Sequence, residues 1–185
     1  MNEITGNKET EVNIPENKVM DIPDFITDYD IYLFREGKHF SLYNKLGAHL
    51  TSHENRQGTF FAVWAPNAKS VSVVGNFNSW QEDSHYLHYR PDESGVWQGF
   101  IPDVLKGEIY KYHIVSTFNN YTVEKADPMA KYNEQPPKTA SIVWEDSHQW
   151  QDEAWINNRA INNSLESPFS AYELHLESWM RVPEE

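Results

Sequence analysis

Two pairs of histidines have spacings that occur in metal sites. His49 and His53 lie four residues apart, and His85 and His88 lie three apart. On a helix, either spacing would place two imidazoles on one face, where they could bind zinc. Both pairs lie in sequence typical of turns, and no third ligand stands at a fixed spacing. Surface or core histidines are the favoured interpretation, and we expect no metal site.

Groups that could carry out catalysis are also few. The acidic pairs Glu82-Asp83 and Asp92-Glu93 lie between apolar runs and are typical of solvated loops. The chain has no cysteine, no Gly-x-Ser-x-Gly motif and no phosphate-binding glycine loop. We therefore expect no catalytic residue and no cofactor in these 185 residues.

A tryptophan and a lysine suggest binding chemistry instead. Trp80 follows the Asn-rich segment 75–79, where an indole has no clear core face to join. Alternation over residues 108–115 puts Tyr110 and Tyr112 on the core face and Lys111 on the other. A ring that covers the C–H face of a sugar, beside an ammonium that donates to its hydroxyls, would bind carbohydrate. The spacing is equally compatible with a Trp80 that folds back over the sheet edge.

Short apolar runs separated by turn residues predict the strands that position these side chains. The expected strands span residues 58–65, 70–75, 95–101, 108–115 and 140–144. Within the first, Phe60 and Phe61 must lie on opposite faces. Strands at intervals of roughly ten to fifteen residues favour an antiparallel sandwich over βαβ units. Residues 58–145 are therefore predicted to form an all-β, immunoglobulin-like sandwich.

The flanking segments differ from this pattern. Residues 1–24 are polar and acidic without periodicity, and we expect a mobile tail. Residues 25–57 predict an N-terminal extension of short helical turns packed on the sandwich. Residues 146–168 predict a linker with one short helix. Within 169–185, the alternation over 171–176 predicts a strand, which pairs with the preceding domain or opens a domain absent from this chain.

Composition narrows the classes of partner. Fifteen Lys and Arg against 28 Asp and Glu give a net charge of −13, which disfavours nucleic acid and anionic membranes. Aromatic residues make up 14% of the chain, which suits a small β domain and also one that stacks on sugars. The first residues have no signal-peptide core, and no run has membrane-spanning length. We expect a cytoplasmic protein.

Several sequence blocks, taken in order, resemble a known family. They are "FAVWAPNAKSVSVVGNFNSW", "GVWQGFIPDVLKGEIYKYHI", "KADPMA" and "PPKTASIVW". These blocks are similar to the N-terminal region of glycogen (1,4-α-glucan) branching enzymes, in which the sandwich is a family 48 carbohydrate-binding module. "YLFREGKHFSLYNKLGAHL" resembles the segment before that sandwich. "SAYELHLESWMR" resembles the first strand of the (β/α)₈ catalytic barrel that follows it. The resemblance covers about residues 30–182.

The resemblance implies a function and a site. By this resemblance, Trp80 and Lys111 match glucan-contacting residues of related glycogen-binding modules, and Tyr121 stands where those modules place a second stacking aromatic. The family transfers a segment of α-1,4-glucan to a 6-hydroxyl with retention, using carboxylates on later barrel strands. This chain would then be a non-catalytic module whose partners are α-glucan (glycogen) and its own catalytic barrel. A stand-alone glucan-binding protein, and a related debranching or trehalose-releasing enzyme, remain as alternatives.

Overall fold

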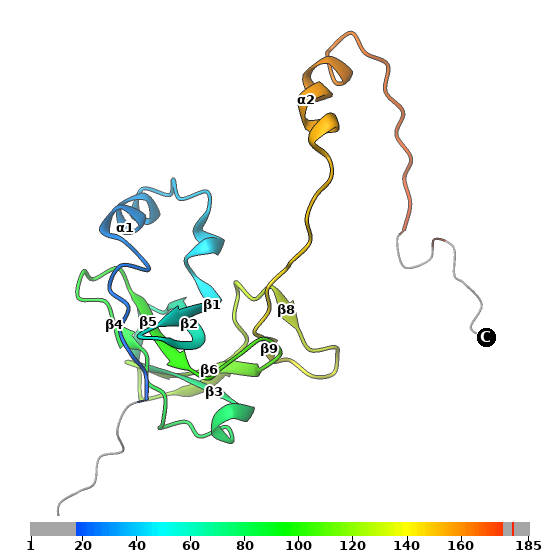
Figure 1. Cartoon of the computed structure of the whole chain (residues 1–185). Coiled ribbons are helices and arrows are strands. Elements are labelled where there is room, and N and C mark those ends of the chain that lie inside the picture. Colours follow the sequence, from blue (N-terminus) through cyan, green and yellow to red (C-terminus); the bar gives the residue numbers. More distant parts are fainter. Residues whose placement is uncertain (1–17, 176–178, 180–185) are drawn as a thin grey trace, which may run out of the picture. The chain divides into compact units, whose positions relative to one another are not determined.

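The computed structural model describes residues 18–175 and 179, and the chain divides into two compact units, residues 1–146 and 147–185 (Figure 1). Each unit is considered by itself. No helix within the described residues has both the length and the apolar character needed to cross a membrane.

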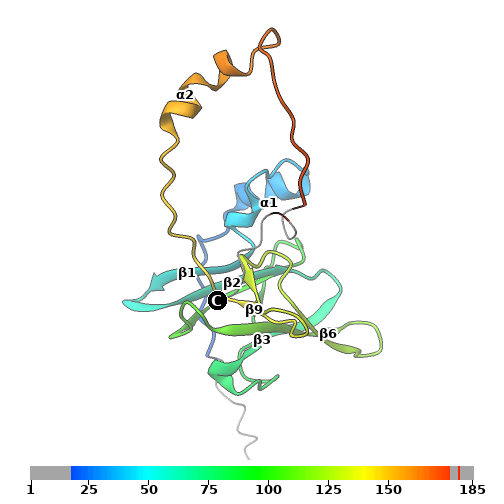
Figure 2. The ribbon, with the colours of Figure 1, turned by 90° about the vertical axis from the view of Figure 1, so that its right-hand side faces the viewer.

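The first unit is a sandwich of two antiparallel sheets, as the sequence predicts. The first sheet has the order β1-β2-β5-β4, formed by Gly47–His53, Arg56–Trp64, Val96–Pro102 and His88–Tyr89. The second has the order β3-β6-β9-β8, formed by Ala68–Gly75, Ile109–Ser116, Ser141–Ile142 and Tyr132–Asn133, with β7 (Thr122–Lys125) also paired to β6. The sheets lie one above the other in Figures 1 and 2. Each of the five strands predicted within residues 58–145 overlaps an observed strand.

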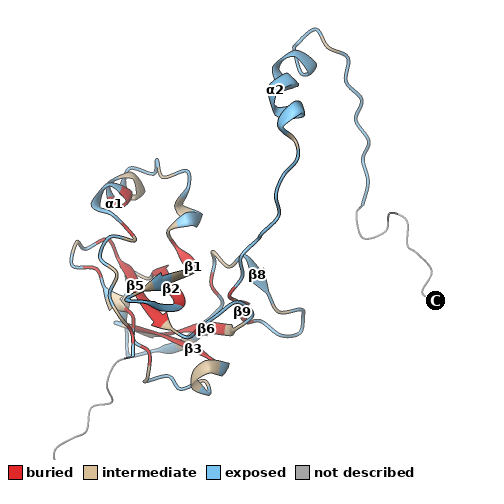
Figure 3. Cartoon of the chain, in the orientation of Figure 1, coloured by how far each residue is buried: buried red, intermediate tan, exposed pale blue. Residues whose placement is uncertain are grey.

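Alternation along β2 builds two cores. Phe61 and Val63 join the cluster between the sheets, which also contains the fully buried Tyr110 and Tyr112. Phe60 lies on the opposite face, where a second cluster packs against the N-terminal extension. The two central strands of the first sheet, β2 and β5, are therefore buried on both faces, and both are mostly red in Figure 3.

The N-terminal extension covers the outer face of the first sheet. It contains the expected helical turns, α1 (Asp28–Arg35) and the 3₁₀ turn η1 (Leu42–Asn44). Ile26 and Ile31 are buried in the second core cluster together with Phe60 of β2. The prediction that this segment packs on the sandwich agrees with these contacts.

The start of α1 is fixed by a polar network around Asp30. Thr27 caps the helix: its hydroxyl accepts from the Asp30 N–H at 3.2 Å, and its own N–H donates to Asp30 Oδ2 at 2.8 Å. Lys45 Nζ and His39 Nε2 each lie 2.9 Å from this carboxylate. Burial opposes ionisation of Asp30, but the hydrogen bonds from Thr27, Lys45 and His39 outweigh it and hold the pKa well below its usual value.

The sequence analysis did not predict the strand β1, which precedes residue 56. Residues 47–53 form β1 and pair along their whole length with β2, where short helical turns were expected. The connection is the pair Glu54-Asn55, both with positive φ (49° and 63°), as in the tight turns that suit a right-handed hairpin twist. The sequence GAHLTSH lacks strict apolar alternation, because this edge strand is only partly buried.

The prediction of a mobile tail over residues 1–24 is wrong for Val19 and Met20. Met20 exchanges two backbone hydrogen bonds with Phe100, each 2.8 Å, and Val19 is buried in the inter-sheet core. Gly99 permits this approach, because a Cβ there would overlap Val19 Cγ1. Residues 1–17 lie outside the described part of the chain.

The second unit contains α2 (Glu153–Asn162), the short helix expected within residues 146–168. No residue of α2 is buried. The strand expected at 171–176 is absent over residues 171–175, which have no regular secondary structure, and residue 176 lies outside the described residues. The described part of this unit contains no other strand, so the alternation there has no ladder to join.

A buried carboxylate joins the core strand β6 to the segment after β7. The hydroxyls of Tyr110 and Tyr112 donate to Asp127 Oδ2 at 2.7 and 3.1 Å, and the Met129 N–H donates to Oδ1 at 2.7 Å. Burial raises the pKa of Asp127 despite these hydrogen bonds. Burial, followed by the adjacent carboxylate, raises the pKa of both tyrosines well above 10.

These tyrosines predict a loss of stability at alkaline pH. Because their pKa is higher in the folded chain than in the unfolded chain, the stabilisation is complete below about pH 10 and is lost as pH rises above it. Each fully shifted tyrosine lowers the free energy of unfolding by about 1.4 kcal/mol per pH unit in that range. Tyr110→Phe should therefore reduce the slope by about this amount in denaturant titrations from pH 9.5 to 11.5. Tyr29→Phe, at an exposed position, is the control; equal slopes in wild type and Tyr110→Phe would contradict the assignment.

Candidate carbohydrate-binding site

The loop after β3 presents Trp80. It begins with the 3₁₀ turn η2 (Asn76–Asn78), and Ser79 and Trp80 then adopt positive φ angles of 55° and 60°. The Trp80 N–H returns to the carbonyl of Gly75 at 2.9 Å. Two consecutive left-handed residues other than glycine cost of order 1–2 kcal/mol each, so the loop needs support from other contacts.

Asn78 provides that support. Its amide nitrogen lies 3.0 Å from the Val73 carbonyl, 3.1 Å from the Ser84 hydroxyl and 3.1 Å from His85 Nδ1, so its two N–H groups are shared among these acceptors. Its Oδ1 accepts from the Gly75 N–H at 3.0 Å. The side chain thus closes the loop on itself and on β3. The sequence analysis noted the Asn-rich segment but did not identify Asn78 as the residue that holds it.

The Trp80 ring is half-buried and lies outside both core clusters. Its Nε1–H donates to Asn76 Oδ1 at 2.9 Å, within the same loop. The structure thus supports an intermediate between the two sequence-based alternatives: the ring is neither fully exposed nor part of a core.

Lys111 lies close to this loop in the second sheet. Val74 pairs with Lys111, and Gly75 pairs with Tyr110, so the Trp80 loop starts at the end of the sheet where Lys111 stands. Lys111 is on the face opposite Tyr110 and Tyr112, as predicted, with its Nζ 3.7 Å from Glu124 on β7. An ion pair of this length at a partly exposed position contributes little to stability and leaves donor capacity for a ligand.

His113 lies on the same face as Lys111 but is buried, which its outward direction alone did not predict. Its Nε2 is 3.6 Å from the carboxylate of Glu82, in the segment after Trp80. Its Nδ1 has no hydrogen-bond partner among the described residues. Ser72, opposite His113 in the register, donates to the Glu82 carbonyl. These contacts hold residues 82–85 over the outer face of the second sheet.

Tyr121 lies at the other end of β6. It ends the turn between β6 and β7, where the hairpin tip was predicted, and its side chain is 62% exposed. Val115 and Thr122 form the last pair of that hairpin, four residues along β6 from Lys111. At about 3.3 Å per residue this is about 13 Å. Tyr121 therefore does not contact the Trp80–Lys111 end, and only an extended ligand would reach both.

The histidine pairs do not assemble a metal site within the described residues. His49 Nε2 lies 3.0 Å from the Leu46 carbonyl, and the ring of His53 packs edge-on against Phe100. His85 is occupied by Asn78 and Ser84. Across residues 18–175 and 179, no group of three or more His, Cys, Asp or Glu side chains is placed to bind a metal ion.

Comparison with known families identifies the kind of module that the sandwich resembles. Residues 45–130 match the family model of carbohydrate-binding module 48 (isoamylase N-terminal domain), so this sandwich is a family 48 module. Matches to solved structures include pullulanases from Klebsiella oxytoca (TM-score 0.43, 29% identity, 55% of this chain and 10% of that chain) and Bacillus acidopullulyticus (TM-score 0.40, 22% identity, 54% and 12%).

The particular family follows from curated relatives. The chain is 54% identical over 155 residues to the 1,4-alpha-glucan branching enzyme GlgB of Albidiferax ferrireducens, covering 84% of this chain and 24% of that protein. It is 48% identical over 160 residues to GlgB of Aquifex aeolicus, covering 86% and 25%. These residues are similar to the part of 1,4-alpha-glucan branching enzymes that the chain aligns with, and they contain the region that matches the family 48 model. The chain spans about a quarter of the length of the curated relatives it matches.

The role of Asn78 is testable without a ligand. Asn78→Ala removes the hydrogen bonds that hold the left-handed residues of the loop, so we expect a loss of about 2 kcal/mol in the free energy of unfolding. The Trp80 amide should exchange with solvent at least tenfold faster in hydrogen-exchange measurements. Asn67→Ala, at an exposed position, is the matched control. Protection of the Trp80 amide that survives Asn78→Ala would show that the loop is held by other contacts.

Proposed function

We propose that this chain is the N-terminal, non-catalytic region of a 1,4-α-glucan branching enzyme. The observation that carries the proposal is the 54% identity to a GlgB protein over 84% of the chain. In the proposed reaction an α-1,4 linkage is cleaved and the freed segment is joined to a 6-hydroxyl, with retention at the anomeric carbon. As a retaining hexosyltransferase, the whole protein would act on glycogen in the cytoplasm.

We further propose that the Trp80–Lys111 end of the second sheet binds α-glucan. The half-buried indole offers an apolar surface for a pyranose ring, and the Lys111 ammonium offers donors for its hydroxyls. Tyr121 would stack on the same glucan several units away. Covering about 50 Å² of apolar surface on one sugar contributes about 1–1.5 kcal/mol. Two such contacts together with several hydrogen bonds would give about millimolar Kd for a single glucan chain. A polymer with many ends binds more tightly through multivalency.

The remainder of the branching enzyme is the second proposed partner. In the unit formed by residues 147–185, Trp155, Ile161 and Leu165 are largely exposed, as is Phe169. Isolated exposed apolar residues are ordinary, but a run of them on and after a helix without buried residues is typical of a segment covered by another domain. The catalytic barrel is the domain that the branching-enzyme family supplies.

We first expect that the 185-residue chain has no branching activity. The 185-residue chain should form no α-1,6 branches in amylose, measured as new chain ends after debranching digestion, because the carboxylates of a retaining mechanism lie on barrel strands. The full-length natural protein should form them under the same conditions. Branching by the short chain, or none by the full-length protein, would contradict the proposal.

We also expect that Trp80→Ala weakens the binding of the chain to glycogen. Removing the ring should lower affinity for glycogen about tenfold in affinity electrophoresis, which matches the lost stacking contribution of about 1–1.5 kcal/mol. Trp150→Ala removes an exposed tryptophan from the other unit and is the matched control. Circular dichroism establishes that both variants are folded. Retention of Trp80→Ala equal to wild type would exclude this site.

A further inference from the structure

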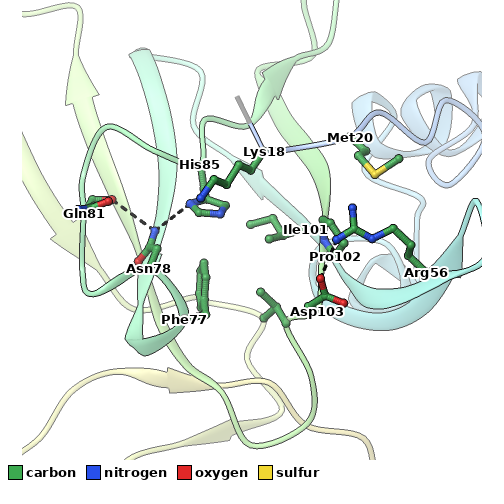
Figure 4. A pocket seen from close by; sticks show the side chains of 11 residues that line it. Lys18, Met20, Arg56, Phe77, Asn78, Gln81, His85, Ile101, Pro102 and Asp103 are labelled. Carbon is green, nitrogen blue, oxygen red and sulfur yellow. Dashed lines mark hydrogen bonds and ion pairs between the residues drawn. The ribbon is translucent and has the colours of Figure 1, made fainter. Parts of the chain in front are cut away.

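A cavity of about 640 Å³ is lined in part by Asn78 and Gln81, which flank Trp80 in the loop after β3 (Figure 4). Its volume is within the range of about 300–1,000 Å³ typical of small-molecule sites. Residues of the loop after β3, of the β5 end and of the segment before α1 line it. Arg56 of β2 also lines it, and the residues that carry the argument below are Gln81, His85, Ile101, Asp103 and Val104. None of the sequence-based site residues lies in it.

The floor of the cavity is apolar. Ile101 and Val104 are almost fully buried, and Phe77 and Pro102 are half-buried beside them. In Figure 4, Ile101 lies between two groups of polar side chains. Such a floor suits the C–H face of a sugar ring, which needs apolar contact below and hydrogen bonds at its edges.

One polar edge is formed by the loop. His85 Nδ1 lies 2.8 Å from the Ser84 hydroxyl and accepts from the Asn78 amide at 3.1 Å. Burial, followed by the nearby Lys18 ammonium, lowers the pKa of His85, which favours the neutral imidazole. With Nδ1 as acceptor, Nε2 carries the proton and is a donor. Gln81 adds an amide with both a donor and an acceptor.

The other polar edge is the ion pair between Arg56 and Asp103, with Nη2 and Oδ2 2.6 Å apart. Both side chains are more than half exposed, so the remaining guanidinium donors and carboxylate lone pairs are open to a ligand. Each edge therefore combines donors with acceptors, which matches vicinal hydroxyls. The Arg56 guanidinium is already paired with Asp103, and Lys18 is the remaining charged group among the described lining residues, within a chain of net charge −13, so an uncharged ligand is favoured.

We propose that this cavity is a second carbohydrate site, which binds an uncharged α-1,4-linked oligosaccharide. The choice of an α-1,4-glucan rests on the function proposed above, whereas the cavity and its polar edges do not. The loop that presents Trp80 continues directly into Gln81, so one glucan-binding loop would serve both sites. Two sites in one module would hold a branched polymer more tightly than either site alone.

Titration of the ¹⁵N-labelled 185-residue chain with maltotetraose tests the proposal. We expect two groups of amide shifts: one at Lys111 and Glu124, and another at Asp103 and Val104. The double variant Gln81→Ala/Arg56→Ala should raise the Kd reported by the cavity amides at least fivefold and leave the Lys111 group within twofold. Its fold should persist, because both side chains are exposed.

Two further variants separate this inference from the proposed function. Trp80→Ala should abolish the shifts at Lys111 and keep those at Val104. Gln135→Ala, an exposed glutamine elsewhere in the sandwich, should change neither. Shifts confined to the Lys111 group would overturn the cavity site and leave the proposed function intact. Shifts confined to the cavity amides would support the cavity site and exclude the Trp80 surface.

Two other results would also count against the cavity site. The absence of both groups of shifts up to about 20 mM maltotetraose would overturn both sites, because that concentration exceeds the expected millimolar Kd. Shifts of the cavity amides with glucose 6-phosphate and none with maltotetraose would show that the cavity selects an anion, which contradicts the assignment of an uncharged ligand.

Discussion

Burial of both faces of the first sheet is the constraint on which the arrangement of this module depends. Phe60 and Phe61 follow one another in β2 and are both inaccessible to solvent, one under the N-terminal extension and one between the sheets. A strand with large apolar side chains on both faces needs two covering layers. The second sheet supplies one layer, and α1 with its flanking turns supplies the other. The extension is thus an integral layer of the fold.

The outer face of the second sheet differs from that of the first. Its inner face is closed by Tyr110 and Tyr112, and their hydroxyls are bound to the buried carboxylate of Asp127. Its outer face carries Lys111 and His113, which the same alternation directs away from the core. The polar character of that face therefore follows from the packing of the opposite face, since residues of one strand alternate between the two.

The loop after β3 starts at the end of the sheet near Lys111, and its residues Asn78 and Gln81 line the cavity. The Asn78 side chain fixes the loop backbone through hydrogen bonds to Gly75 and Val73. The positive φ angles at Ser79 and Trp80 then turn the chain. Trp80 lies outside both core clusters, and Gln81 lines the cavity. A change in the backbone of this loop would alter both surfaces together.

The sequence by itself determined the sandwich, its principal strands and the two faces of β2 and β6, because a period of two is a local property of the chain. It also carried the family, through motifs that lie in order along the chain. The tertiary structure decided the rest. Residues 47–53 form a strand because β2 offers its free edge, and residues 18–20 are ordered because Gly99 leaves space for Val19.

The candidate site shows the same division. Trp80 and Lys111 were identified from residue type and alternation, and the register confirms that Lys111 stands near the start of the Trp80 loop. Tyr121 was named only through the family resemblance, and its place at the far end of β6 depends on the hairpin register. The burial of His113 beneath Glu82 and the cavity between the loop and the Arg56–Asp103 pair depend on long-range contacts. Such contacts join residues distant in sequence, so periodicity and spacing contain no signal for them.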